Sequence, residues 1–273
     1  MRLRRRLDRE LVDRGLARGE PEALELIAAG RVLVDGAPAI AASRLVDAAS
    51  SLRVLAEPRP YVTRGGTKLA GALDDLAIAV SGRRCLDAGA GAGGFTDCLL
   101  QRGAGEVVAV DVGYGDFDWS LRQDPRVRLF ERANIRVVDV ELLGPPFDLV
   151  VADLSFISLA AVAPRLVEVT APDGDLLLLV KPQFEAPRDD VGPGGIVRDP
   201  AVWSSTVGAV ADALWAEGVG TAGVVASQLP GTDGNREFFL YARRRAPAPD
   251  AAAMRAAVGA AAEAAAEIGA GAP

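Results

Sequence analysis

Lysine is nearly absent from this sequence, and the two lysines that do occur stand where chemistry could be done. The 273 residues include 28 arginines but only Lys68 and Lys181. Arginine is effectively never deprotonated, whereas a lysine amine can lose its proton and then accept another. Lys68 precedes a glycine-rich turn, and Lys181 ends an apolar run. Either the two lysines have a role that arginine cannot fill, or they are remnants of drift toward arginine.

Two carboxylates accompany the lysines in the predicted layout. Asp153 follows the apolar run 149–152, Lys181 follows the run 176–180, and Glu237 begins the last apolar segment. In an open parallel sheet the carboxyl ends of the strands meet at one edge, where ligands bind. If the last strand is antiparallel, its start meets the same edge, and Lys68 approaches from the helix before the first strand. We therefore expect the four ionisable groups to converge. The alternative is a set of salt bridges at strand ends.

The residue types suit the deprotonation of a hydroxyl group. The sequence has no histidine, so a general base has to be Lys, Asp, Glu, Cys or Tyr. A second cation nearby lowers the pKa of a lysine, which favours proton acceptance. We expect Lys181 to act on the hydroxyl, with Asp153 and Glu237 fixing its amine and Lys68 as the neighbouring charge. The two cysteines, Cys85 and Cys98, lack the spacing of metal ligands, so we expect no metal site.

A glycine-rich turn follows the first predicted strand and indicates a ligand with an adenosine group. Residues 87–94 read DAGAGAGG. The glycines are Gly89, Gly91, Gly93 and Gly94. Three of them satisfy G-x-G-x-x-G, so a dinucleotide such as NAD is the alternative. Asp87 favours S-adenosylmethionine (SAM), because a carboxylate there pairs with a cationic amino-acid group and gains nothing from a pyrophosphate. Asp111, at the end of the next strand, suits a ribose in both cases.

Alternating helices and apolar strands from residue 64 onward predict a doubly wound, Rossmann-like α/β domain. We expect strands at 84–87, 107–111, 127–130, 147–153 and 176–180, and helices at 68–76, 94–102 and 201–217. Segments 224–228 and 237–243 would close the sheet as a hairpin-like pair. The strands at 147–153 and 176–180 are too continuously apolar to alternate, which is typical of strands covered on both faces.

The chain is expected to divide into two domains. Residues 1–57 read as a small α+β domain, 58–63 as a proline-containing linker and 64–246 as the α/β domain. Residues 247–273 read as an Ala/Pro-rich tail with one weak helix near 250–268. The net charge is −7, yet residues 1–18 hold seven arginines against three acids. Such a basic arm can bind phosphates, because fields fall off over about 8 Å at physiological salt.

At these motifs the sequence resembles the TlyA family, bacterial rRNA 2′-O-methyltransferases, also called hemolysins, that have an FtsJ-like catalytic domain. The matching segments are 64–69, 87–96, 111–115, 153–158, 181–185 and 234–239, within about residues 3–245. The resemblance implies a catalytic tetrad of Lys68, Asp153, Lys181 and Glu237. It implies SAM as cofactor and a ribose 2′-hydroxyl of rRNA, with cytidine the expected nucleoside, as acceptor. The expected cofactor-binding residues are Asp87, Gly89, Gly91, Gly93, Gly94, Phe95, Asp111, Asn134 and Asp153.

The N-terminal domain resembles an S4 RNA-binding domain, with one departure. The expected RNA-binding residues are Arg4, Arg6, Arg14, Arg18 and Arg31. Where the S4 pattern has Ser-Arg, this chain has Gly19-Glu20-Pro21, which should weaken contact with phosphate. The cofactor loop also departs from its family, with Gly91-Ala92 where Ser-Thr is common.

The reading from sequence is a cytoplasmic SAM-dependent methyltransferase that acts on rRNA in ribosomal subunits. One alternative is an S4-type RNA-binding protein without catalysis, which the complete tetrad disfavours. Another is a membrane-active cytolysin. No apolar run approaches the ~20 residues of a membrane span, and no strongly amphipathic basic helix is apparent, so we expect no membrane partner.

Overall fold

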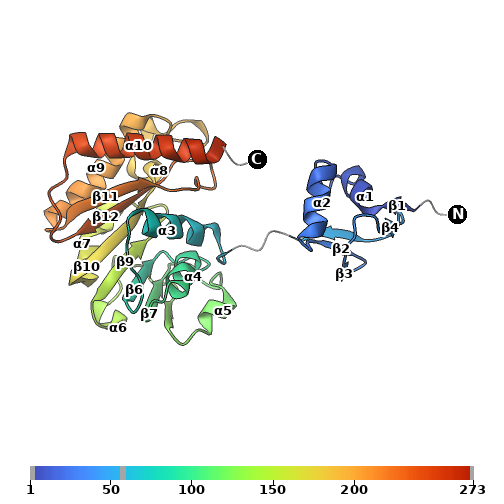
Figure 1. The fold of residues 1–273 in the computed structure, drawn as a ribbon. Coiled ribbons are helices and arrows are strands. Elements are labelled where there is room, and N and C mark those ends of the chain that lie inside the picture. The colour runs from blue at the N-terminus through green and yellow to red at the C-terminus, as the bar shows by residue number, and fades with distance from the viewer. Residues whose placement is uncertain (1–3, 56–59, 271–273) are drawn as a thin grey trace. The chain divides into compact units, whose positions relative to one another are not determined.

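The computed structural model describes residues 4–55 and 60–270, which belong to two compact units (Figure 1). The first unit comprises Met1–Arg59 and the second Pro60–Pro273. Each unit has a hydrophobic core of its own.

The first unit is a small α+β fold. Its elements are β1 (Arg5–Arg6), α1 (Leu7–Asp13), α2 (Glu20–Ala28), β2 (Val32–Val34), β3 (Ala37–Pro38), β4 (Leu45–Val46) and β5 (Leu52–Val54). β2 pairs with β3 and β5 in an antiparallel sheet, and β1 pairs with β4. The core joins Leu7 and Leu11 of α1, Ile27 of α2 and Val32 of β2. Leu7 and Leu11 are four residues apart, so they lie on one face of α1.

The second unit is built on a seven-stranded sheet. The strands are β6 (Arg84–Ala88), β7 (Glu106–Val110), β8 (Val127–Phe130), β9 (Phe147–Ala152), β10 (Thr170–Val180), β11 (Gly220–Ala226) and β12 (Phe238–Arg243). They lie in the order β11-β12-β10-β9-β6-β7-β8. The five strands from β10 to β8 are parallel, and β12 is antiparallel to β10 and to β11. An antiparallel strand inserted next to the sheet edge departs from the all-parallel dinucleotide fold.

Helices cover both faces of this sheet, as the doubly wound expectation requires. They are α3 (Arg64–Asp75), α4 (Gly94–Gln101), α5 (Trp119–Arg122), α6 (Val140–Leu143), α7 (Leu159–Val169), α8 (Pro182–Glu185), α9 (Pro200–Ala216) and α10 (Ala251–Ala270). One core cluster joins α7, α9 and α10 to one face of the sheet. A second cluster joins α3 and α4 to the other face.

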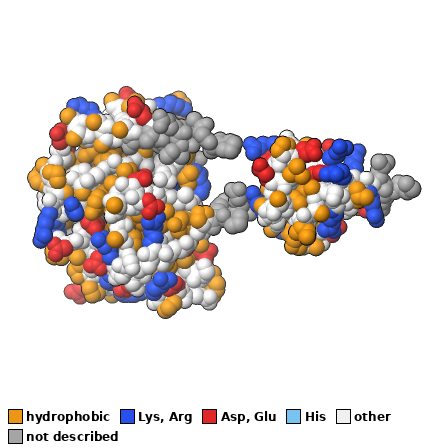
Figure 2. Space-filling view, in the orientation of Figure 1, with side chains coloured by type: hydrophobic (Ala, Val, Ile, Leu, Met, Phe, Trp, Pro, Cys, Tyr) orange, Lys and Arg blue, Asp and Glu red, His pale blue; other side chains and the backbone are white. Residues whose placement is uncertain are grey.

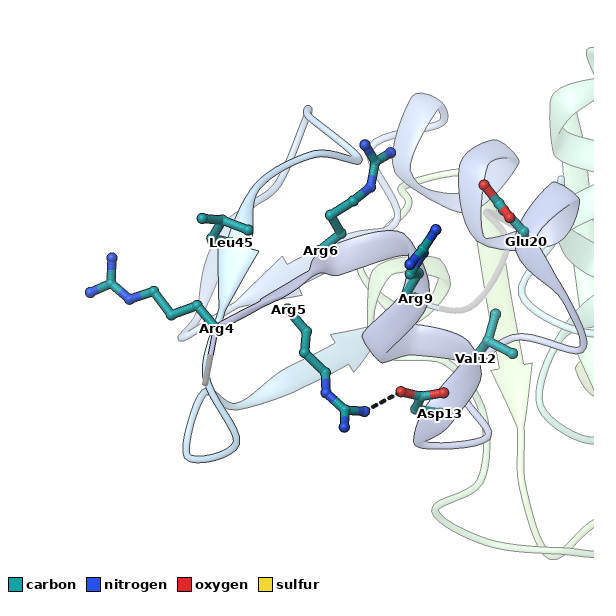
Figure 3. Close-up of a pocket in the computed structure, with 8 residues that line it drawn as sticks. All are labelled: Arg4, Arg5, Arg6, Arg9, Val12, Asp13, Glu20 and Leu45. Atoms are coloured by element: carbon teal, nitrogen blue, oxygen red, sulfur yellow. Dashed lines mark hydrogen bonds and ion pairs between the residues drawn. The ribbon is translucent and has the colours of Figure 1, made fainter. Parts of the chain in front are cut away.

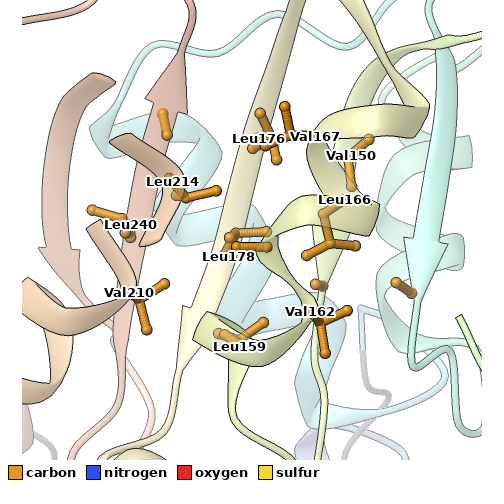
Figure 4. Close-up of a cluster of buried hydrophobic side chains, with 14 of the residues drawn as sticks. Val150, Leu159, Val162, Leu166, Val167, Leu176, Leu178, Val210, Leu214 and Leu240 are labelled. Atoms are coloured by element: carbon orange, nitrogen blue, oxygen red, sulfur yellow. The ribbon is translucent and has the colours of Figure 1, made fainter. Parts of the chain in front are cut away.

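Alternate residues of the central strands enter opposite cores. Leu176 and Leu178 of β10 pack with α7 and α9, around Leu166 and Val210 (Figure 4). Leu177 and Leu179 belong to the other cluster. Burial on both faces therefore explains why these strands are continuous apolar runs rather than alternating ones.

Two boundaries differ from the expectation. The linker expected at 58–63 lies partly outside the described residues, and its described part, Pro60–Thr63, belongs to the second unit and packs on α4. The amide of Val62 donates to Asp97 at 2.8 Å, and Gln101 Nε2 donates to the carbonyl of Pro60 at 2.9 Å. The tail expected after Ala246 contains the helix expected near 250–268, as α10, but this helix packs on α9 and β11 with Met254 and Val258 in the core. Its alanine-rich sequence hid this, because alanine contributes little to an apolar stripe.

The surface of the second unit mixes the two signs of charge. On the face drawn in Figure 2, basic and acidic side chains are interspersed. Among the residues that the structure describes, no helix has the length and apolarity needed to cross a membrane.

Candidate active site

The register of β12 brings Glu237 to the end of β10. Phe238 is paired with Val180, so Glu237, which precedes β12, lies beside Lys181, which follows β10. The antiparallel direction on which the predicted convergence depended is therefore confirmed. Asp153 follows the neighbouring parallel strand β9, and its carboxylate approaches Lys181. Lys68 reaches the same edge from α3.

Lys68 and Glu237 form a buried ion pair. The Lys68 amine donates to Glu237 Oε2 at 2.5 Å, and the two side chains are 10% and 3% exposed. Burial raises the pKa of the Glu237 carboxyl above its ordinary value, while the ammonium groups of Lys68 and Lys181 oppose that rise. Both lysines therefore act on this carboxylate, and Lys68 holds it directly.

Lys181 lies between an anion and a hydroxyl. Its Nζ is 2.6 Å from Asp153 Oδ1, which makes an ion pair by distance. The amine donates its hydrogen bond to Ser155 Oγ, at 3.0 Å, rather than to this carboxylate. The amine also lies 5.8 Å from the centre of the Phe184 ring. The side chain is only 11% exposed, so a ligand reaching it would meet an amine whose position is already fixed.

The expected pairing of the tetrad is wrong in one respect. Sequence reasoning assigns both Asp153 and Glu237 to the Lys181 amine. In the structure Glu237 is bound by Lys68, so the ion pair of Lys181 is with one carboxylate, Asp153, instead of two. The order of residues along strands predicts which edge a group reaches, but it does not fix which of two neighbouring lysines a flexible carboxylate binds.

The four glycines of the 87–94 turn differ in how much space surrounds them. A side chain at Gly89 would lie 2.4 Å from the Asp153 carbonyl oxygen, and one at Gly94 would overlap the Thr63 hydroxyl. A side chain at Gly93 would likewise lie too close to the Leu121 side chain, at 2.5 Å. These three glycines allow close packing of the protein on itself. Only Gly91 of the four has open space where a side chain would be, so it is the position at which a ligand can approach the backbone.

Asp87 is fully buried at the end of β6. Its Oδ2 accepts a hydrogen bond from the Thr96 hydroxyl at 2.7 Å, which ties the strand to the first turns of α4. Its Oδ1 has no hydrogen-bond partner among the described residues. Burial raises the pKa of this carboxyl to about 7, and the Thr96 bonds oppose the rise. The direct contact with a cationic ligand that sequence reasoning assigns to Asp87 therefore meets a side chain with no exposed surface.

Asp111 holds the open side of the glycine turn. One carboxylate oxygen accepts from the amide of Gly91 at 2.8 Å and the other from the amide of Gly113 at 2.6 Å. A carboxylate has about four acceptor positions, so Asp111 retains capacity for ligand hydroxyls. It lines a small pocket with seven other residues. They are Gly91, Gly113, Tyr114, Asp116, Phe117, Leu129 and Glu131.

Two further expected cofactor residues differ in burial. Asn134 is exposed, follows β8, and uses its side-chain oxygen to accept from the amide of Arg136 at 3.0 Å. Its neighbour Ala133 donates to the Asp111 carbonyl, so the segment adjoins the pocket. Phe95 is buried, and its ring packs 6.0 Å from that of Phe239. The Phe95 side chain is thus part of the core.

Sequence reasoning missed residues that shape the loop after Asp153. Phe156 is 92% exposed at a φ of +63°, which is uncommon for a residue other than glycine, and its ring lies 5.1 Å from Phe184. Glu185 accepts from the Ser158 hydroxyl and the Leu159 amide, both at 2.6 Å. Its carboxylate thereby joins the segment after Lys181 to the segment after Asp153.

The arginines expected to bind RNA are not equivalent in the first unit. The guanidinium group of Arg14 donates hydrogen bonds within the first unit, to the Glu10 carboxylate and to the carbonyls of Asp47 and Ser50. Arg31 Nε binds the carbonyl of Leu55. Arg18 is paired with Glu22 but is 83% exposed. Arg6 is paired with Asp8, and Arg4 is exposed. Arg14 and Arg31 therefore have structural contacts that RNA binding would compete with.

Known proteins resemble this chain over most of its length. Residues 61–244 match the model of the FtsJ-like methyltransferase family. The 16S/23S rRNA (cytidine-2′-O)-methyltransferase TlyA of Mycobacterium tuberculosis is 54% identical over 244 residues, which is 89% of this chain and 91% of that protein. Hemolysin A of Brachyspira hyodysenteriae is 33% identical, covering 86% of this chain and 98% of its own. A solved structure of a candidate hemolysin of Streptococcus thermophilus matches with a TM-score of 0.71 and 33% identity, over 96% of this chain and 97% of that one.

Proposed function

The chain belongs to the TlyA family of FtsJ-like methyltransferases, and we propose that it transfers a methyl group from SAM to the 2′-hydroxyl of a cytidine in ribosomal RNA. The observation that supports this is the gathering of two lysines and two carboxylates at the strand ends beside the glycine turn. The nucleoside and the acceptor atom rest on the relative from M. tuberculosis, whose name specifies both.

The residues around the glycine turn fit SAM. Gly91 borders open space, Asp111 has spare acceptor capacity for ribose hydroxyls, and both line the same pocket. The backbone carbonyl of Asp153 lies against Gly89, and its carboxylate forms the ion pair with Lys181. When bound, SAM supplies a methyl group on a sulfonium, which an oxygen nucleophile can attack in line. We assign Asp111 to hold the ribose and Asp153 to lie between the cofactor and Lys181.

Lys181 is the group that we assign to the acceptor hydroxyl. A ribose hydroxyl is a poor nucleophile until its proton leaves, and the amine is fixed by Asp153 and Ser155 before RNA arrives. In the proposed step the Lys181 amine, once it has released a proton to solvent, would take the hydroxyl proton as that oxygen accepts the methyl group that SAM would supply, and the demethylated sulfide would be the leaving group. A positioned amine of this kind contributes to the rate by general base catalysis.

Lys68 and Glu237 are assigned a supporting part. Their ion pair brings a second ammonium group to the same edge while the Glu237 carboxylate offsets its charge. Because Glu237 is held by Lys68, it is not available to bind the Lys181 amine as a second anion. Among the described residues Lys181 thus makes its ion pair with Asp153, while its charge still acts on the Glu237 carboxylate.

We assign RNA capture to the first unit, whose exposed arginines resemble those of S4 domains, and the site of action to ribosomal subunits in the cytoplasm. The phosphate backbone supplies most of the affinity of such contacts and makes it depend on salt.

The proposal is tested by incubating the purified protein with ribosomal subunits and SAM labelled in its methyl group. We expect label in rRNA, located as 2′-O-methylcytidine by nuclease mapping, and none with Lys181→Ala. Absence of label from both subunits, or label on a base rather than on a ribose, would overturn the proposal.

A further inference from the structure

The first unit has a pocket lined by four arginines, Arg4, Arg5, Arg6 and Arg9. Its remaining lining residues are Val12, Asp13, Glu20 and Leu45. The pocket lies along α1 between β1 and the start of α2 (Figure 3). Sequence reasoning left Arg9 out of the RNA-binding set, and it treated Glu20 as a defect of the S4 pattern rather than as part of the same site.

The four arginines differ in what already binds them. Arg5 reaches Asp13 at 2.5 Å, and Arg6 reaches Asp8 at 2.5 Å. Within residues 4–55 and 60–270, the side chains of Arg4 and Arg9 form no ion pair or hydrogen bond, and both are exposed. In the described part of the chain, a ligand anion would therefore displace no ion-pair partner from these two guanidinium groups. Arg4 extends away from the others, whereas Arg9 lies between Arg6 and Glu20 in the view of Figure 3.

Glu20 faces this pair of arginines without binding either. It is the first residue of α2, where a carboxylate is stabilised by the helix dipole. No ion pair joins it to Arg6 or Arg9 in the described part of the chain. Its field nevertheless reaches Arg6, whose guanidinium pKa is raised chiefly by Asp8 and in smaller part by Glu20. Among the described residues, the pocket therefore holds unpaired arginines next to the unpaired carboxylate of Glu20, while its other acid, Asp13, is paired with Arg5.

We propose that this pocket binds one phosphodiester of the RNA backbone through Arg9 and Arg6, and that Glu20 sets its affinity by repelling the phosphate. The inference rests on the proposed function for its RNA ligand. An arginine fork matches two phosphate oxygens, and Arg6 adds its remaining donor. Arg9 thereby supplies, from α1, the contact that the S4 pattern places at the position of Glu20.

The test measures binding of the full-length protein to an rRNA fragment over a series of salt concentrations. Arg9→Ala should weaken binding at low salt and lower the slope of log affinity against log salt by about 0.7–0.9, the value for one lost phosphate contact. The matched control is Arg53→Ala. Arg53 is an exposed arginine on β5 of the same unit that does not line the pocket, and its variant should bind as the wild type does.

Glu20→Gln is the variant that should gain affinity, which a misfolded protein would not do. It should tighten binding several-fold at low salt, and the gain should shrink in the double variant with Arg9→Ala. The affinity for SAM should be the same in every variant. If Arg9→Ala and Arg53→Ala behave alike, or if Glu20→Gln leaves binding unchanged, the pocket is not a phosphate site. Failure of the proposed function is a separate result, since the wild-type protein would then leave ribosomal subunits unmethylated.

Discussion

Lys181 is the residue at which charge and proton acceptance can be separated. Arginine keeps the positive charge but cannot give up a proton, and its planar fork is wider than an amine. We therefore expect Lys181→Arg to fold and to bind SAM and RNA, yet to lose methyl transfer by ~10²–10⁴-fold, the range attributed to general acid–base catalysis. The measurement is single-turnover transfer of labelled methyl from SAM to rRNA.

Lys68→Arg is the matched control for that experiment. Lys68 acts through Glu237, which a guanidinium can also bind, so the loss of transfer should be smaller than for Lys181→Arg. Transfer by Lys181→Arg at close to the wild-type rate would show that this amine does not take the proton.

Asp87 predicts a pH dependence of stability. Its pKa in the folded protein is about 7, raised by burial from an ordinary value of 3.8. Between about pH 4 and 7 the folded state therefore holds more protons on this group than the unfolded state does. In that window the free energy of unfolding falls as pH rises, by at most about 1.4 kcal/mol per pH unit, and the loss is complete above pH 7.

Asp87→Asn should remove this dependence, because an amide stays neutral and its oxygen can still accept the Thr96 hydroxyl. Urea unfolding of both proteins at pH 5, 6, 7 and 8 measures it. We expect the wild type to lose stability relative to the Asn variant from pH 5 to 7. Parallel curves for the two proteins would mean that Asp87 titrates well below this range.

At this scale the sequence predicts the members of the site better than their contacts. Lys68, Asp153, Lys181 and Glu237 meet at one edge, because strand ends of a parallel sheet have nowhere else to meet. Glu237 binds Lys68 and not Lys181, and Asp87 is completely buried. Both facts depend on side-chain rotamers and on packing between distant segments. The local sequence pattern predicts neither of them.

At the scale of elements, apolar runs predict position well and length poorly. β8 spans the residues expected from its sequence, whereas β10 begins at Thr170, six residues before the apolar run at 176. The added residues include Pro172 and Asp173, which are unusual in strands. Pairing with β9 carries the chain through them with a shift of register between Thr170 and Asp175. Tertiary pairing thus decides where the strand begins.

The loop before β12 yields a prediction about Asn235. This side chain is buried, donates to the Gly195 carbonyl at 2.9 Å and accepts from the Val197 amide at 2.9 Å. It therefore joins two loops, one of which ends in Glu237. We expect Asn235→Ala to cost about 1–3 kcal/mol of stability, as for buried groups left without partners. Denaturant unfolding measures this, and methyl transfer should fall by more than SAM affinity does.

Asn235→Asp keeps the size of the side chain and changes only its hydrogen bonds. An ionised carboxylate still accepts from Val197 but repels the Gly195 carbonyl, whereas the protonated form can donate to it. The Asp variant should therefore be closer to the wild type in stability at pH 5 than at pH 8, with no such recovery for the Ala variant. Equal losses at both pH values would contradict the assigned contacts.

At the scale of the whole molecule, net charge is a poor guide to the partner. The chain carries −7 overall, yet the first unit gathers four arginines in one pocket. The two units also have separate cores. The division into two parts follows from the change of sequence pattern near residue 60, but the docking of Pro60–Thr63 on the second unit does not, because proline suggests a stiff linker whether or not it packs.

This division predicts how the protein responds to removal of residues 1–59. The second unit should keep its fold, since its cores and the contacts of Pro60, Val62 and Thr63 stay intact. SAM binding should therefore remain measurable by calorimetry, while methylation of ribosomal subunits should be abolished for want of the arginines that bind phosphate. The control is removal of residues 1–63, which also deletes the Thr63 cap of α3 and should lower thermal stability. Methylation of ribosomal subunits by the 60–273 protein at the full-length rate would mean that the second unit captures RNA alone. In the full-length protein, activity at subsaturating RNA should fall steeply with salt, because each phosphate that arginine neutralises releases counterions.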